Sequence, residues 1–170
     1  MKTSYTLFLF LSVFLLSCTN DDEQLPLSFL EGTYEQASEN TDTNIWYVNQ
    51  YVFKLDGTYK TFQFLRNTED GPNLGVAYYS MGTYTLRGEE FLIDRNEAAG
   101  VNFEEFPEGY VSTIGDLDPI DISQSAPAKG SLKQLEEGEK ISIAFECNDT
   151  LSENNTINLC IGAQEFVKVD

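Results

Sequence analysis

The chain has 170 residues and is strongly acidic, with 28 Asp and Glu against 10 Lys and Arg, a formal net charge of −18 and no histidine. This balance excludes a nucleic-acid-binding protein, because such proteins concentrate Lys and Arg on one face. Without histidine the chain lacks the usual general base, the usual zinc ligand and a Ser-His pair. We therefore expect one non-catalytic domain without a metal or other cofactor.

The first segment is typical of a secretory signal. Lys2 precedes an apolar run, Leu7–Leu16, which is interrupted only by Ser12 and followed by the small residue Ser17. As a helix this run covers roughly 15 Å of a hydrocarbon core about 30 Å thick, so it is too short to span a membrane. We predict that residues 1–17 are a signal peptide and are removed.

The sequence Leu15-Leu16-Ser17-Cys18 resembles the lipobox of bacterial lipoproteins. The resemblance implies cleavage before Cys18, lipidation of Cys18 and anchorage to a bacterial outer membrane by acyl chains. Residues 18–28 then form a tether that carries the acidic run Asp21-Asp22-Glu23, which anionic lipid headgroups would repel. This run resembles the export signal of Bacteroidetes lipoproteins at the cell surface, so both a surface-exposed and a periplasm-facing orientation remain open.

Residues 29–170 form the predicted domain, and their β-forming side chains include most of the 12 Phe and 9 Tyr. Phe29–Gln36 predicts a first strand. The clearest local signal is a pair of β-rich runs, Trp46–Leu55 and Thr58–Leu65, on either side of Asp56-Gly57. They predict a hairpin, because glycine accepts the positive φ that the turn requires.

The register of this hairpin has two solutions. A two-residue turn would place Tyr51 opposite Phe62, whereas a three-residue turn with Gly57 in the left-handed conformation would place Phe53 opposite Tyr59. A slip of one residue exchanges the two faces of a strand. We favour the three-residue turn, because it pairs Phe53 with Tyr59 on the core side.

A second hairpin is predicted from Val76–Leu86 and Phe91–Ile93, joined at Arg87-Gly88-Glu89. Residues 96–129 contain Pro, isolated Gly and many acids, which predicts long loops around one short strand at Tyr110–Ile114, or a cap over one end of a barrel. Strand patterns then return at Lys140–Phe145, Thr156–Ile161 and Glu165–Val169.

No segment shows the sustained apolar spacing of a helix. Short strands linked mostly by hairpins form an antiparallel sheet, which must close or stack to hide its edges. The sequence therefore predicts an all-β fold, an antiparallel up-and-down β-barrel of about eight strands.

Three segments, Leu30–Tyr34, Tyr51–Tyr59 and Gly82–Gly88, resemble the lipocalin-like lipoproteins of Bacteroidetes. The resemblance covers Phe29–Ile93 and implies a small up-and-down barrel with a cup open at one end. The chain departs from true lipocalins at Tyr34, where their first-strand motif has Trp. A fold of this kind does not determine a ligand.

With Cys18 assigned to the lipid, Cys147 and Cys160 are an even pair in an oxidising compartment, so we predict a disulfide between them. The sequence Asp149-Thr150-Leu151 lies in the predicted loop between them. It resembles the O-glycosylation motif of Bacteroidetes envelope proteins, which implies a glycan on Thr150.

The acidic clusters predict a solvated surface. Paired acids such as Glu89-Glu90 cannot form a catalytic dyad by themselves, because neighbours on a strand point to opposite faces. Asp116, Asp118 and Asp121 could gather on one loop as a calcium site, but they lack the Asp-x-Asp-x-Asp-Gly pattern with its distant Glu.

Two classes of function follow for the barrel. In the first, inward aromatic residues, among them Trp46, Phe53, Tyr59 and Tyr84, line a cup for a small apolar or glycan ligand, although the same side chains could instead fill the core. In the second, the protein is an accessory lipoprotein that contacts another envelope protein and has no ligand of its own. A fixed cavity favours the first class and a solid core favours the second.

We predict that Cys18→Ala releases the protein from membranes, because each buried acyl methylene contributes about 0.8 kcal/mol to anchorage. Membrane fractionation together with the intact mass of the protein checks this. Cys160→Ala is the matched control and should remain in the membrane fraction. A Cys18→Ala protein that stays with membranes at the mass expected for the substitution alone would contradict the assignment.

Overall fold

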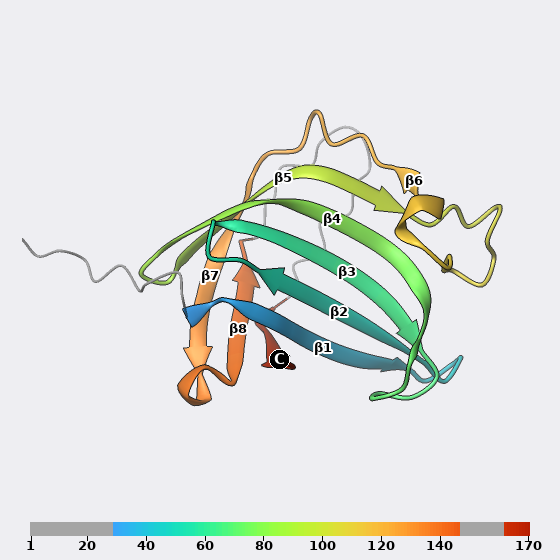
Figure 1. Cartoon of the computed structure of the whole chain (residues 1–170), viewed down its shortest axis with the longest axis horizontal. Coiled ribbons are helices and arrows are strands. Elements are labelled where there is room, and N and C mark those ends of the chain that lie inside the picture. The colour runs from blue at the N-terminus through green and yellow to red at the C-terminus, as the bar shows by residue number, and fades with distance from the viewer. Residues whose placement is uncertain (1–28, 147–161) are drawn as a thin grey trace, which may run out of the picture.

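The computed structural model describes residues 29–146 and 162–170, and these residues form a closed, eight-stranded antiparallel β-barrel (Figure 1). This confirms the predicted all-β, up-and-down barrel. Within the described ranges there is no α-helix, and so none that could cross a membrane. The barrel strands are β1 (Gly32–Asn40), β2 (Ile45–Phe53), β3 (Thr58–Arg66), β4 (Asn73–Arg87), β5 (Glu90–Gly100), β7 (Ala128–Leu135), β8 (Lys140–Phe145) and β9 (Gln164–Lys168).

Each barrel strand pairs with the next one in the chain, and β9 pairs back to β1. The two-residue strand β6 (Asp118–Pro119) pairs with the last residues of β5 outside this circuit. Two short 3-10 turns, η2 (Ile114–Asp116) and η3 (Glu136–Gly138), complete the described elements. Closure hides the sheet edges that an open sheet of this size would expose.

The β2–β3 hairpin has the predicted three-residue turn. Phe53 lies opposite Tyr59, the two side chains are 1% and 2% exposed, and Gly57 has a φ of +79°. The Lys54 backbone N–H donates to the Thr58 carbonyl at 3.0 Å and closes the turn. The second predicted hairpin is also confirmed, since β4 and β5 are joined at Gly88 with a φ of +59°.

Two expectations about the weaker segments were wrong. The predicted strand at Tyr110–Ile114 is reduced to a single bridge between Val111 and Val76. In contrast, β5 runs on to Gly100, well past the predicted end at Ile93. Residues 94–97 of β5 are all exposed, so the apolar alternation that reveals a strand is absent there.

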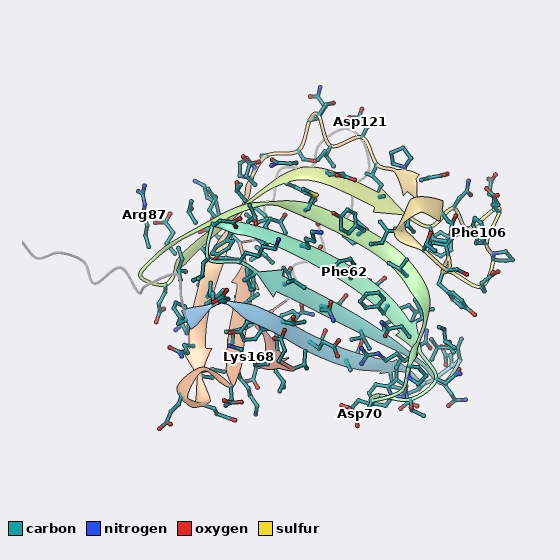
Figure 2. The ribbon with its side chains drawn as sticks, viewed as in Figure 1. Phe62, Asp70, Arg87, Phe106, Asp121 and Lys168 are labelled. Atoms are coloured by element: carbon teal, nitrogen blue, oxygen red, sulfur yellow. The ribbon has the colours of Figure 1, made fainter. Side chains whose placement is uncertain are left out.

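Part of the loop-rich segment packs on the outside of the barrel wall. Val111 and Leu117 form a second apolar cluster with Val76, Tyr79 and Ala99 of strands β4 and β5. Phe62 and Phe64 of β3 stack at 5.3 Å beside this cluster, and Phe106 packs against it from the loop side. Figure 2 shows Phe62 on the wall that faces the viewer and Phe106 in the adjoining loop segment. The segment therefore covers an outer face.

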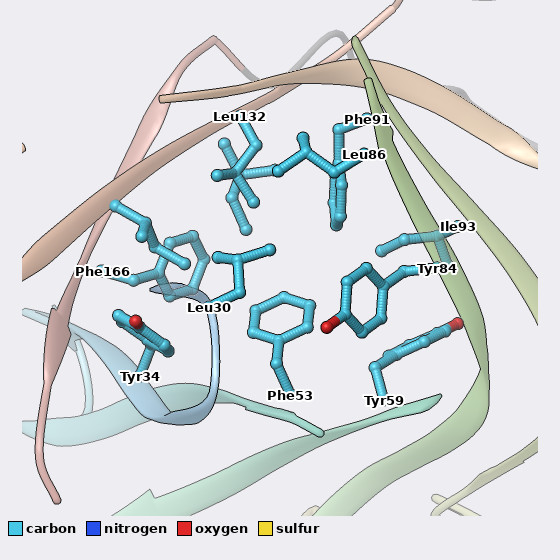
Figure 3. Close-up of a cluster of buried hydrophobic side chains, with 12 residues drawn as sticks. Leu30, Tyr34, Phe53, Tyr59, Tyr84, Leu86, Phe91, Ile93, Leu132 and Phe166 are labelled. Carbon is cyan, nitrogen blue, oxygen red and sulfur yellow. The ribbon is translucent and has the colours of Figure 1, made fainter. Parts of the chain in front are cut away.

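The main core fills one end of the barrel. All eight barrel strands contribute buried side chains to it, β2 through Phe53 and β3 through Tyr59 (Figure 3). Leu30 reaches it from the segment before β1. Phe53 contacts the rings of Tyr84 and Phe91 edge-on, at 5.1 and 6.1 Å. Edge-to-face aromatic packing of this kind adds about 0.5–1.5 kcal/mol per pair to the burial of the rings. This end of the barrel is filled by side chains.

The seam between β1 and β9 closes the barrel with few backbone pairs. Only Tyr34 and Glu35 have partners on β9. Side chains extend the seam: the Asp170 carboxylate accepts hydrogen bonds from the Thr33 backbone N–H at 2.6 Å and from the Thr33 hydroxyl at 2.8 Å. The Lys168 ammonium donates to the Glu31 carbonyl at 2.8 Å. These contacts join two segments that are 137 residues apart in sequence.

Stability should therefore depend on the ionised form of Asp170, whose pKa is lowered by the hydrogen bonds from Thr33. A carboxyl group with a lowered folded-state pKa stabilises the fold above its unfolded pKa, about 3.9, and this contribution is lost as the pH falls through the folded value. We expect Asp170→Asn to lower the free energy of unfolding by about 0.5–1 kcal/mol at neutral pH, because water competes for this exposed group.

Urea unfolding over a series of pH values measures this effect. The deficit of Asp170→Asn should shrink as the pH is lowered below about 4. Asp94→Asn, at an exposed position of β5, is the control and should unfold like the wild type at every pH. A deficit for Asp170→Asn that does not change with pH would contradict the role of the carboxylate.

Candidate binding site inside the barrel

The strands of the barrel differ in length, so part of the inner face of the long strands lies beyond the ends of the short ones. Strands β1 to β5 have 9 to 15 residues, whereas β7, β8 and β9 have 8, 6 and 5. Along β5, strand β7 pairs only with Glu90–Ile93, and along β1, strand β9 pairs only with Tyr34 and Glu35. Figure 1 shows β1 to β5 side by side as one long curved wall. Within the described chain, the inner face of this wall extends past the short strands.

We call a set of polar residues at inward positions of β1 to β5 beyond the filled core the polar inner wall; the apolar residues Leu65 and Ala98 also occupy inward positions there. The side chains of this wall point into the barrel because they alternate along the strands with the core residues Tyr34, Phe53 and Tyr59. They also lie opposite one another on neighbouring strands. The polar inner wall consists of Gln36, Asn49, Tyr51, Thr61, Gln63, Tyr78, Ser80 and Arg95.

Hydrogen bonds between neighbouring strands hold several of these side chains in place. The Asn49 amide donates to Gln36 at 3.0 Å and accepts from Gln63 at 3.1 Å, which makes a row of three amides across β1, β2 and β3. The hydroxyls of Thr61 and Ser80 lie 2.7 Å apart. Each amide has two donor hydrogens and an acceptor oxygen, so the row retains hydrogen-bonding capacity beyond these contacts.

Tyr51 joins the filled core to the polar inner wall. Its ring stacks on Phe53 at 5.6 Å and meets Phe166 edge-on at 5.1 Å. Burial raises the pKa of its phenol, the neighbouring Tyr59 raises it further, and Arg95 acts in the opposite direction. Tyr51 therefore keeps its proton and offers a neutral donor and acceptor.

Tyr59 has a buried hydroxyl without a partner among the described residues. Its ring belongs to the core, and its oxygen points away from the other labelled side chains (Figure 3). Burial raises the pKa of this phenol, whereas Arg95 and Ser80 lower it, so both lie on the side toward which the hydroxyl points. An unpaired buried hydroxyl costs about 1–3 kcal/mol, which makes this group a candidate ligand contact.

Charges are sorted between the two faces of the same wall. Glu35, Glu39, Asp94 and Glu97 occupy outward positions, because they alternate with inward residues or pair with outward ones. The Arg66 guanidinium binds Glu35 on this outer face with contacts of 2.9 and 3.0 Å. Among the inward positions of β1 to β5 the single charged residue is Arg95, opposite Gly82.

The predicted ligand-contacting aromatic residues do not all come together. Phe53 and Tyr84 lie in the filled core, where the Tyr84 hydroxyl donates to the Lys54 carbonyl at 2.9 Å. Tyr59 spans the core and the polar inner wall. Trp46, which we expected to face inward, lies on the outer face opposite Arg66. It is an odd number of residues from Phe53 on one strand, so the two side chains point to opposite faces.

Sequence reasoning missed the amides and Arg95. The period-two alternation from Phe53 and Tyr59 is a signal that places Asn49 and Gln63 on the inner face. The same alternation from Phe91 and Ile93 reaches Arg95, because the additional β5 residue, Asn96, comes only after it.

The remaining predicted sites give no further cluster. Asp116 accepts from the Thr113 hydroxyl at 2.9 Å, and Asp118 accepts from the Asn102 amide at 3.1 Å. Asp121 accepts from a backbone N–H in its own turn. Within residues 29–146 and 162–170, no three Asp, Glu, Cys or His side chains gather in a group that could hold a metal ion. The predicted modification and strand sites outside the described residues are Cys18, Cys147, Thr150, Cys160 and Thr156–Ile161.

The unpaired hydroxyl leads to a prediction on stability. Tyr59→Phe removes a buried group without a partner, so we expect the free energy of unfolding to stay constant or rise by about 1 kcal/mol. Tyr84→Phe, the matched control, removes a hydroxyl that donates to Lys54 and should lower stability by about 1 kcal/mol. Urea unfolding of both variants decides the matter, and an equal loss in both would show that the Tyr59 hydroxyl is satisfied.

No protein-family model, curated protein or solved structure matches this chain. Its functional interpretation therefore depends on the residues that the barrel brings together, above all the polar inner wall and the unpaired hydroxyl of Tyr59.

Proposed function

We propose that this protein is a lipid-anchored, non-catalytic binding module of the bacterial outer membrane, and that the polar inner wall binds a small glycan. The observation that carries the proposal is the division of the barrel interior. One end is filled by packed aromatic and aliphatic side chains, whereas the inward positions beyond it carry amides, hydroxyls and tyrosines.

This division favours a glycan over an apolar ligand. An apolar molecule needs apolar surface, and at the apolar end Phe53, Tyr84 and Phe91 already pack against one another. A sugar presents many hydroxyls, and burying them requires matching donors and acceptors. The amides of Gln36, Asn49 and Gln63 provide both, and the ring of Tyr51 beside them provides an apolar surface for the sugar face.

Binding without catalysis agrees with the distribution of acids. Glycoside hydrolysis requires two carboxyl groups on either side of the scissile bond. The inward positions of β1 to β5 hold no Asp or Glu, because the acids of these strands lie on the outer face. The amides and hydroxyls of the inner wall can hold a sugar but do not supply this acid-base pair.

A specific observation supports a second candidate, an accessory lipoprotein that contacts another envelope protein. Three large apolar side chains of the loop-rich segment are exposed: Phe103 at 70%, Ile114 at 43% and Ile120 at 44%. Apolar side chains exposed on one loop segment favour protein contacts. In this case the partner would bind the outside of the barrel and leave the inner wall free.

Isothermal titration calorimetry of the full-length protein in lipid nanodiscs, against a panel of neutral and acidic oligosaccharides, tests the proposed function. Thr61→Val removes an inward hydroxyl that contacts Ser80. We expect it to weaken binding roughly five- to tenfold, the loss of about one hydrogen bond.

Thr85→Val is the matched control, because Thr85 is exposed on β4 and alternates with the inward Tyr84. It should bind as tightly as the wild type. Equal weakening by both variants, or no binding of any oligosaccharide in the panel, would contradict the proposal. In the latter case the accessory role would be the better interpretation.

A further inference from the structure

Arg95 and Tyr59 lie on either side of Gly82 in the barrel wall. Gly82 pairs with Tyr59 on β3 and with Arg95 on β5, so the three positions form one row across adjacent strands. Residues paired in this way share a face of the sheet. Because Gly82 has no side chain, nothing on β4 separates the phenol from the guanidinium along this row.

The surroundings of Arg95 are free of competing charge. Among the described residues, Arg95 has no ion pair, and the polar groups beside its guanidinium include the phenols of Tyr59 and Tyr51, whose pKa values it lowers. By contrast, Arg66 is paired with Glu35, Lys133 with Glu89 and Lys140 with Glu136. The neighbouring acids of β5, Asp94 and Glu97, lie on the outer face. In a chain with a net charge of −18, the inner wall thus presents a cation and no carboxylate.

The polar groups next to Arg95 are suited to an anion. The Tyr59 hydroxyl is buried, has no partner among the described residues and points away from the core. A guanidinium presents two parallel N–H groups that match the two oxygens of a carboxylate. A phenol that keeps its proton can donate a third hydrogen bond to the same group. The row then satisfies a hydroxyl that is otherwise left unpaired.

We infer that the ligand of the polar inner wall is an acidic sugar, whose carboxylate is bound by the guanidinium of Arg95 and the hydroxyl of Tyr59. This inference rests on the proposed function and specifies the class of glycan. The amide row of Gln36, Asn49 and Gln63 binds the hydroxyls of the same or the next sugar ring. A fatty acid would offer the same carboxylate, but its chain could not satisfy the amides of Gln36, Asn49 and Gln63, which a sugar's hydroxyls can.

The test compares an acid with its own ester. Wild-type, full-length protein in nanodiscs is titrated calorimetrically with the disaccharides of galacturonate and glucuronate, with their methyl esters, and with octanoate. The ester keeps every sugar hydroxyl and removes the charge. We expect at least one acidic disaccharide to bind ten times more tightly than its ester, and octanoate to bind more weakly than either.

Variants locate the effect. Arg95→Gln should make the acid and the ester bind equally, and Tyr59→Phe should reduce the preference for the acid several-fold. Arg87→Gln is the matched control, because Arg87 is exposed at the β4–β5 turn, away from the inner wall, and the preference should be unchanged. Since Arg95 is itself exposed, its substitution should preserve the fold, which circular dichroism checks.

Each result has a separate meaning. Equal wild-type binding of acid and ester would overturn the inference while leaving glycan binding in place. Tighter binding of octanoate than of every sugar would overturn both the acidic-sugar class and the glycan proposal. Loss of the acid preference in Arg87→Gln as well as Arg95→Gln would show that the general charge of the protein, and not Arg95, determines it.

Discussion

Closure of the barrel at the β1–β9 seam is the constraint on which the rest of the structure depends. The strand ladder there pairs Tyr34 and Glu35 of β1 with β9, and the Val169 backbone N–H donates to the Thr33 carbonyl. The side chains of Lys168 and Asp170 extend the seam by binding the chain just before and at the start of β1. Without this seam, β1 and β9 would both be open edges. The core would also lose its shape, because Tyr34 and Phe166 enter it from the two strands that meet there.

Closure with strands of unequal length gives the interior two different ends. Where all eight strands are present, inward side chains meet from every direction and fill the space with Phe53, Tyr84 and Phe91. Beyond the ends of β7, β8 and β9, the inward residues of β1 to β5 have no facing strand in the described chain. Amides and hydroxyls occupy these positions, and they bond to one another across neighbouring strands.

The acidic and basic side chains of the long wall lie mostly on different faces. The outer face of the long wall carries its acids, of which Glu35 is bound by Arg66, and the inner face carries Arg95. In this net negative chain, the inward positions of the long wall thus carry one cation, the exposed Arg95.

The sequence by itself determined the all-β class, the two hairpins and the pairing of Phe53 with Tyr59, because these depend on local turn chemistry at Gly57 and Gly88 and on nearby alternation. Only the tertiary structure decided which strands meet at the seam and where the filled core ends. It also brought Tyr59 and Arg95 together across Gly82. One physical reason is that polar inward residues look like outward ones, so the apolar alternation that reveals a strand is lost. The other is that closure of the barrel joins segments that are too far apart in the sequence for any local signal.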